Sequence, residues 1–124
     1  MATKFSDVSV LQTITTKIAT GVNINVCSAQ PANYAGIAAV SLASVAVTSG
    51  DWTASTSGSG ATIEAVLTAA SKSGVSISAS GTAIYLTVDD GTTLLEGTTI
   101  TSQAITSGGT LTIGSWTVTV PQPN

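Results

Sequence analysis

The sequence predicts a mainly β protein, a single antiparallel β-sandwich or barrel-like domain with a short N-terminal α-helix. Segments in which apolar and polar residues alternate recur roughly every 8–12 residues between residues 22 and 120, as in sandwiches and barrels. Threonine is abundant, at 22 residues beside 17 serines, and β-branched side chains favour pleated strands. The 124 residues contain no internal repeat and no long linker, so residues 1–124 are expected to form one domain.

Residues 6–20 are predicted to form the helix. Their apolar residues recur at helical spacing, at Val8, Leu11, Ile14 and Ile18. Ser6 or Asp7 is suited to cap the beginning of this helix, and Gly21 is suited to end it. The threonines of the segment favour a strand instead. The spacing supports a short helix better than a strand.

The first half of the chain then predicts three strands. Residues 22–27 alternate between apolar and polar side chains, which is typical of a half-buried strand. Residues 29–38 contain proline, asparagine and glycine and are predicted to form a loop. Strands are predicted at residues 41–49 and 51–55, and the glycine-rich residues 56–61 are expected to be a flexible loop or hairpin tip.

The middle of the chain predicts further strands and a hairpin. Residues 62–72 fit either a helix or a strand, and we favour the strand. Residues 75–79 and 82–88 alternate and are predicted strands. Asp90-Gly91 follows them and indicates a tight hairpin turn, since turns of type I′ need positive φ angles.

The last part of the chain predicts the closing strands. Residues 93–106 continue the strand pattern and end at a glycine-rich turn, residues 107–109. Residues 110–120 predict a final strand whose alternation shifts at Gly114, which is expected to be a β-bulge. The prolines of residues 121–124 prevent further pairing, so a short tail is expected there.

The charge balance argues against several classes of partner. Six carboxylates stand against three lysines and no arginine, which gives a net charge of -3. Nucleic-acid binding and electrostatic binding to anionic lipid both need a basic surface, so neither is expected. No apolar run is long enough for a membrane span, and no signal peptide is predicted. Charged residues are only 7% of the chain, so its surface costs little to bury against another protein.

The residue types also argue against catalysis. The chain has no histidine, which excludes Ser-His-Asp and Cys-His catalysis and most zinc sites. The single cysteine, Cys27, cannot form an internal disulfide and is predicted to be a small buried residue at the end of a strand. Asp89 and Asp90 lack the further ligands of a calcium loop. We therefore predict no enzyme activity, no cofactor, and no catalytic or metal-binding residue.

Three residues are candidates for an interface with another molecule: Tyr34, Pro31 and Trp52. Tyr34 lies near a proline in a predicted loop, and aromatic side chains are enriched at binding hot spots. Trp52 and Trp116 also fit a second role, as core anchors, and we favour this role over that of ligand platforms. A binding site for a carbohydrate or receptor would need the fold to gather exposed aromatic or carboxylate side chains around Tyr34, Trp52, Tyr85 or Trp116.

Several motifs of the chain resemble, in the same order, those of a family of small virion structural proteins of tailed bacteriophages. The resemblance covers about residues 6–120 and is carried by Cys27 to Tyr34, Thr48 to Asp51, Ser80 to Ala83, Val88 to Leu95, and Thr99 to Gly108. The chain departs from the family pattern at Asp51-Trp52, where a longer glycine-rich insertion is expected. The resemblance implies a component that is made in the host cytoplasm and incorporated into the virion.

The function expected from this resemblance is that of a capsid decoration, or cement, protein. Such a protein binds the outer surface of the phage head, contacts the major capsid protein and stabilises the shell without catalysis. Self-association is also expected, and a trimer at a local three-fold axis is one form that fits. The alternatives are a tail-tube, connector or fibre-associated virion protein, and a receptor- or carbohydrate-binding β-module.

Overall fold

The computed structural model describes residues 7–122 of the chain. Strands make up 51% of the chain and their sheets are antiparallel, which confirms the prediction of a mainly β fold with an N-terminal helix. The helices and strands of the described residues follow one another as α1 (Val8–Ile18), β1 (Asn23–Cys27), α2 (Tyr34–Val40), β2 (Ser41–Ala46), β3 (Trp52–Ser57), β4 (Glu64–Ala69), β5 (Lys72–Ser76), β6 (Gly81–Asp89), β7 (Leu94–Ile105), β8 (Thr110–Ile113) and β9 (Trp116–Val120).

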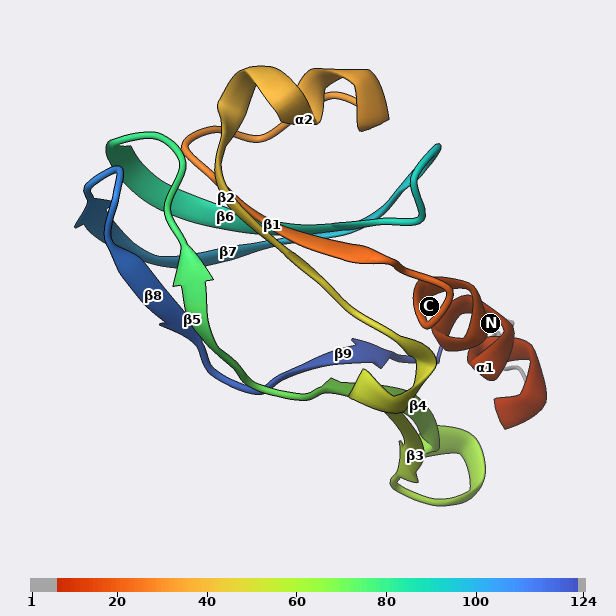
Figure 1. Cartoon of the computed structure of the whole chain (residues 1–124). Coiled ribbons are helices and arrows are strands. Elements are labelled where there is room, and N and C mark those ends of the chain that lie inside the picture. The colour runs from red at the N-terminus through yellow and green to blue at the C-terminus, as the bar shows by residue number, and fades with distance from the viewer. Residues whose placement is uncertain (1–6, 123–124) are drawn as a thin grey trace.

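The strands form three sheets, which lie around one core (Figure 1). The largest has the strand order β2-β1-β6-β7, the second has the order β3-β4-β9, and β5 pairs with β8 in the third. In Figure 1 the four-stranded sheet lies above the three-stranded sheet, the β5–β8 pair joins the two on one side, and α1 lies at the other end. The buried apolar side chains meet between these layers, and Ile24, Leu67 and Val88 are among the largest that are fully buried.

Helix α1 begins and ends close to the predicted limits. The Asp7 carboxylate accepts a hydrogen bond from the backbone N–H of Ser9 and so caps the helix, whereas Ser6 lies outside the described residues. The buried face of α1 differs from the predicted one. Ile14 is 51% exposed, and Thr15 is buried in its place together with Leu11 and Ile18. The sequence favoured Ile14 because it is apolar, but the orientation of the helix on the core selects positions 11, 15 and 18.

Strand β1 lies inside the four-stranded sheet and confirms the predicted strand. The prediction that this strand is half-buried is wrong, because residues on both of its faces are buried. Its neighbours are β2 and β6, which pair with it in antiparallel register. Ile24 and Val26 enter the core, so the alternation of the strand turns Asn23, Asn25 and Cys27 towards the opposite face of the sheet. Helix α2 lies over that opposite face (Figure 1).

The prediction of a loop over residues 29–38 is wrong in its second half, where α2 begins. The Asn33 side chain accepts a hydrogen bond from the backbone N–H of Gly36 and caps this short helix. Ile37 is its buried residue. Proline and glycine in the segment indicate a loop. A helix of two turns has too few apolar positions for their helical spacing to be recognised against these loop signals. The capping asparagine is the local signal that was available.

The hairpin predicted at Asp90-Gly91 joins β6 to β7, but its turn is not of type I′. A type I′ turn needs positive φ at both central residues. Gly91 has φ of +93°, whereas no residue other than glycine has positive φ among those described. The loop instead spans residues 90–93, and the backbone N–H of Asp90 donates to the carbonyl of Thr93. The Asp90 carboxylate accepts hydrogen bonds from the backbone N–H groups of Thr92 and Thr93. These bonds stabilise the loop, which therefore does not need a second residue with positive φ.

The predicted β-bulge at Gly114 is also wrong, because residues 110–120 form two strands of different sheets. Strand β8 pairs with β5, and β9 pairs with β4. Gly114 lies between them, at the point where the chain passes from one sheet to the other. The alternation of apolar and polar residues does shift at Gly114, and the shift marks the point where the chain leaves one sheet and enters another. Which partner each half takes is decided by strands more than 30 residues away in the sequence.

Most remaining segments lie close to their predictions, but the strand predicted at residues 75–79 is displaced and forms as β5, which ends at Ser76. Strand β2 is shorter than the predicted strand over residues 41–49, and β3 extends into the predicted loop over residues 56–61. Strand β4 confirms the preference for a strand over residues 62–72. Short 3-10 turns at Ser49–Asp51 and Gly60–Thr62 precede β3 and β4. No helix within residues 7–122 has both the length and the apolar character that crossing a membrane requires.

Candidate binding surfaces

The outer face of the four-stranded sheet is unusually polar beneath α2. Strands β1 and β6 pair so that three outward-facing pairs of residues lie opposite one another: Asn23 and Asp89, Asn25 and Thr87, Cys27 and Tyr85. Side chains that are directly opposite in antiparallel strands interact across the pair. Two amides and a carboxylate are thereby gathered on one end of this face.

Asp89 is the centre of this polar group. Its side chain is buried, with only 3% of the residue exposed. The carboxylate accepts hydrogen bonds from the Nδ2 atoms of Asn25 at 2.7 Å and Asn23 at 3.3 Å, and from the backbone N–H of Gly91 at 2.9 Å. All three donors are neutral, so they satisfy the oxygens of the carboxylate without cancelling its charge.

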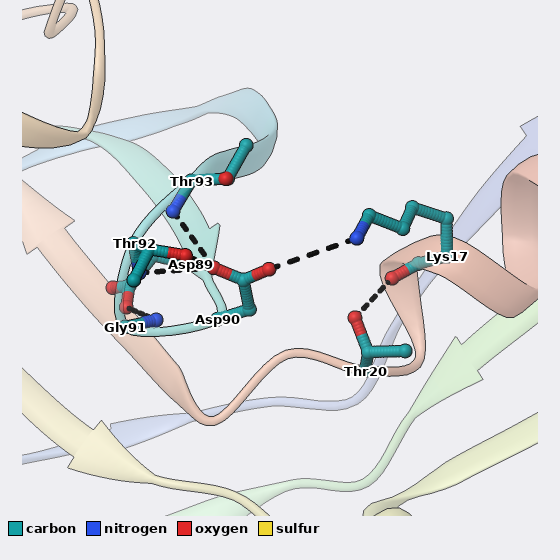
Figure 2. A network of polar contacts seen from close by, with 7 residues as sticks. All are labelled: Lys17, Thr20, Asp89, Asp90, Gly91, Thr92 and Thr93. Carbon is teal, nitrogen blue, oxygen red and sulfur yellow. Dashed lines mark hydrogen bonds and ion pairs between the residues drawn. The ribbon is translucent and has the colours of Figure 1, made fainter.

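The neighbouring Asp90 points away from Asp89 and fixes the hairpin to the end of α1 (Figure 2). Its Oδ2 lies 3.8 Å from the Nζ of Lys17. Hydrogen bonds from the backbone N–H groups of Thr92 and Thr93, with a smaller contribution from Lys17, hold the pKa of Asp90 below its usual value. The two adjacent aspartates thus contact different elements: Asp89 contacts β1, and Asp90 contacts its own hairpin and α1.

A pocket of about 270 Å³ lies between α2 and this polar face. Asn23, Asn25 and Asp89 contribute its polar side, while Ala35, Ile37 and Ala38 of α2 contribute an apolar wall. A second, more open pocket of about 460 Å³ adjoins it at Tyr34 and is bounded by residues 92–94 of the hairpin. The two pockets share Tyr34 and Ala35, which therefore lie between them.

The structure separates the three candidate interface residues. Tyr34 is 39% exposed at the beginning of α2, and Pro31 is buried in the wall of a neighbouring groove with Tyr85 and Thr87. Both lie on the α2 side of the molecule. Trp52 is 8% exposed in the core, where its ring meets that of Trp116 edge-to-face with centroids 6.1 Å apart. The second predicted role of Trp52, that of a core anchor, is the one its position fits.

Asn23, Asn25 and Asp89 were not among the sequence candidates. The alternation of residues 22–27 did place the two asparagines on one face, and Asp89 continues the outward-facing positions of β6. Nothing in the sequence indicated that β1 pairs with β6, which is separated from it by more than 50 residues. The pairing of these two strands creates the polar group.

Cys27 ends β1 and is fully buried, as predicted. Its Sγ lies 3.7 Å from the Oγ1 of Thr87. Burial raises the pKa of the Cys27 thiol, so the thiol stays protonated at neutral pH. A reactive cysteine needs the opposite shift, produced by a positive neighbour. The surroundings of Cys27 therefore fit a packing role.

Replacing Cys27 with serine is expected to lower the free energy of unfolding by about 1 kcal/mol, a modest loss. The serine hydroxyl keeps Thr87 as a hydrogen-bond partner, while the larger and more apolar sulfur is lost from a dry site. Urea unfolding followed by tryptophan fluorescence measures the change. A folded Cys27→Ser protein that loses its function would show that the thiol has more than a packing role.

A second candidate surface is made by residues 97–122, none of which is charged. Residues 97–122 contain no aspartate, glutamate, lysine or arginine. They include most of β7 and all of β8 and β9. Strand β7 is an outer strand of the four-stranded sheet, and β9 is an outer strand of the three-stranded sheet. Each therefore has an edge that no strand of the described residues covers.

A groove of about 340 Å³ lies within this surface, between β7 and the β8–β9 segment. Its lining is mainly apolar and includes Leu86, Ile100, Ile105, Leu111 and Trp116. Thr101 and Gln103 lie at the groove and are exposed. We call residues 97–122 with this groove the charge-free surface. An apolar groove with a polar uncharged border is the kind of surface that another protein covers at low desolvation cost.

Glu96 lies immediately before the charge-free surface, opposite Val88 of β6. Burial raises the pKa of its carboxyl above the usual 4.5. Because the folded state favours the neutral form, Glu96 lowers the free energy of unfolding at pH values above its folded pKa, and this cost disappears below the unfolded pKa. Within residues 7–122 the structure gives Glu96 no hydrogen bond or ion pair that would offset the burial.

Replacing Glu96 with glutamine is therefore expected to raise the melting temperature at pH 7 and to leave it unchanged near pH 3. The gain is expected to stay within about 0.5 kcal/mol, because the side chain is only partly buried. Calorimetry at both pH values measures it. Glu64→Gln on β4 is the control for the loss of one negative charge, and an equal gain in both variants would attribute the effect to net charge alone.

Neither a search for metal ligands nor a comparison with known proteins points to a further site. No group of three or more histidine, cysteine, aspartate or glutamate side chains able to hold a metal occurs in the part of the chain that the structure describes. Comparisons with protein-family models, curated proteins and solved structures give no match to this chain.

Proposed function

We propose that this chain is a non-enzymatic structural protein of a tailed-bacteriophage virion, a decoration protein that binds the outer surface of the head. The observation that carries the proposal is the charge-free surface, with its uncovered strand edges and apolar groove. The resemblance of the sequence motifs to small virion proteins gives the context. The acidic balance of the chain supports a place outside the shell, away from packaged DNA.

The mechanism of such a protein is stoichiometric binding. Each copy buries its charge-free surface against major capsid protein subunits, and the interface removes on the order of 1,000–2,000 Å² from water. Few charges lose their hydration when this surface is buried, so desolvation offsets little of the free energy gained by burying the apolar groove. A ligand that binds the assembled shell and not its separated subunits stabilises the shell by mass action. Self-association of the chain, as a trimer at a local three-fold axis, is part of the same proposal.

The copy number in purified particles tests this proposal first. Quantitative mass spectrometry compares the chain with the major capsid protein of the same particle. A ratio near one, or a simple fraction such as one third, supports decoration of the whole lattice. A few to a few dozen copies would instead place the chain in the tail, connector or fibres. Absence from the particle would overturn the virion proposal.

A charge placed in the groove tests the surface itself. Gln103→Lys adds a charge at an exposed position beside the groove, and Ser55→Lys adds the same charge at an exposed position on β3. We expect Gln103→Lys to weaken binding to undecorated heads by at least about 10-fold, because a lysine buried at the interface has to be desolvated. Co-sedimentation measures the binding. Equal binding by both variants would exclude the charge-free surface as the interface.

A further inference from the structure

We propose that the pocket beneath α2 binds an organic cation, a primary ammonium group carried on an alkyl chain. This proposal is independent of the virion role. The pocket is the 270 Å³ space whose polar side is made by Asn23, Asn25 and Asp89. Three properties of the pocket point to this ligand: its uncompensated charge, the direction of its amide groups, and its apolar wall.

The first property is a buried negative charge without a cation. Asp89 is almost fully buried and receives only neutral donors. The two lysines of the described residues are engaged elsewhere, Lys17 with Asp90 and Lys72 with Asp51 at 3.0 Å. A buried carboxylate is stabilised most when a positive group is close to it. The charge of Asp89 therefore favours a cation in the adjoining pocket.

The second property is the orientation of the two amides. A carboxylate only accepts hydrogen bonds, so Asn23 and Asn25 must each turn an N–H towards Asp89. Their amide oxygens are consequently directed away from the carboxylate. No hydrogen bond to either oxygen occurs among residues 7–122, although both side chains line the pocket. The side chains that line the pocket thus carry two amide oxygens without a protein donor, close to a negative charge.

An ammonium group matches this set of atoms. It carries one positive charge and three donors and has no acceptor, so every hydrogen-bonding atom it brings is suited to the amide oxygens and the carboxylate. Sugar hydroxyls would bring acceptors as well as donors and no charge. An anionic ligand would be repelled by Asp89. The chemistry of the polar side therefore favours an ammonium group over both.

The third property is the wall that α2 supplies. Ala35, Ile37 and Ala38 line the pocket opposite the polar side. An alkyl chain packs against such residues while its charged end stays at the polar groups, as lysine side chains do at protein surfaces. The ligand chemistry is therefore alkylammonium. It is found in the lysine side chain of a protein partner and in free polyamines.

An NMR titration of the ¹⁵N-labelled chain tests this proposal. The probe is n-butylammonium at pH 7, and 1-butanol is the neutral control of equal chain length. We expect saturable shifts in the side-chain amide signals of Asn23 and Asn25, with at least about 10-fold weaker binding of the alcohol. N-acetyl-lysine methylamide and spermidine then distinguish the two sources of the ligand, since the natural source should bind more tightly.

Two substitutions on α2 separate binding in the pocket from general attraction to an acidic protein. Ala38→Phe fills the pocket and leaves the Asp89 group intact, whereas Ala39→Phe adds the same ring at an exposed position outside the pocket. We expect Ala38→Phe to weaken n-butylammonium binding by at least about 10-fold and Ala39→Phe to leave it unchanged. Asp89→Asn should also abolish binding, and its folding is checked by the dispersion of the same spectra.

Three results would overturn the proposal. The first is equal binding of n-butylammonium and 1-butanol, which would remove the role of charge. The second is undiminished binding by a folded Ala38→Phe protein, which would place the cation elsewhere. The third is saturable binding of methyl glycosides at the same signals without binding of the ammonium probe, which would assign the pocket to a carbohydrate.

Discussion

Replacing Leu67 with alanine is expected to lower the free energy of unfolding by about 3 kcal/mol, the largest loss among the substitutions considered. Leu67 is 1% exposed and lies in β4, the middle strand of the three-stranded sheet. Its neighbours across the sheet are Ala54 and Val118. Alanine removes the apolar contacts and leaves a cavity that strands fixed on both sides cannot close. Urea unfolding measures the loss as a lower midpoint with an unchanged slope.

Leu94→Ala is the matched control for this substitution. Leu94 begins β7, is only partly buried, and lies outside the core cluster, so the same deletion removes fewer contacts. Its expected loss is about 1 kcal/mol. Equal losses for the two variants would show that the space between the sheets is not the main source of stability. A changed slope would indicate that Leu67→Ala alters the unfolded state or the cooperativity.

Replacing Gly21 with alanine is expected to lower the free energy of unfolding by about 2–3 kcal/mol. Gly21 follows α1, where the chain turns into β1, and a Cβ built there would lie 2.4 Å from Cγ1 of Val88. The added atom would also lie 3.1 Å from the carbonyl oxygen of Ile18. Val88 is fully buried, and close packing of the core opposes its displacement. The helix must therefore shift away from the sheet, which weakens the packing at this end of the core.

Gly114→Ala is the control, because a Cβ at Gly114 would meet no atom within 4 Å. Its backbone is not in the positive-φ region, so alanine is expected to leave stability within about 1 kcal/mol or to raise it slightly. Thermal unfolding by circular dichroism compares the two variants. A wild-type melting temperature for Gly21→Ala would show that α1 is free to adjust and does not close the core tightly.

The sequence predicted much of the local structure because local causes govern it. The alternation of residues 22–27 and 82–88 is caused by the two faces of a strand, and both strands form as expected. The limits of α1 follow from its spacing and from Asp7. These properties depend on neighbours within a few residues, which the sequence displays directly.

The failures share one physical origin, which is that partners distant in the sequence decided the outcome. Ile14 of α1 was expected to be buried, yet the core selects Thr15. Residues 29–38 carried loop signals, yet packing on β1 supports α2 over part of them. Residues 110–120 were expected to form one strand, yet β5 and β4 each bind one half. In each case the outcome depends on contacts with residues that are distant in the sequence.

The mainly β class, the N-terminal helix and the long segment without charge could be predicted from the sequence. These are properties of composition and of short-range periodicity. The tertiary structure alone decided which strands pair, and with that pairing it gathered Asn23, Asn25 and Asp89 beneath α2 and opened a groove beside β7. The physical reason is that each strand offers the same backbone hydrogen bonds to any partner. The choice among partners rests on packing of side chains from the whole chain, which no short segment encodes.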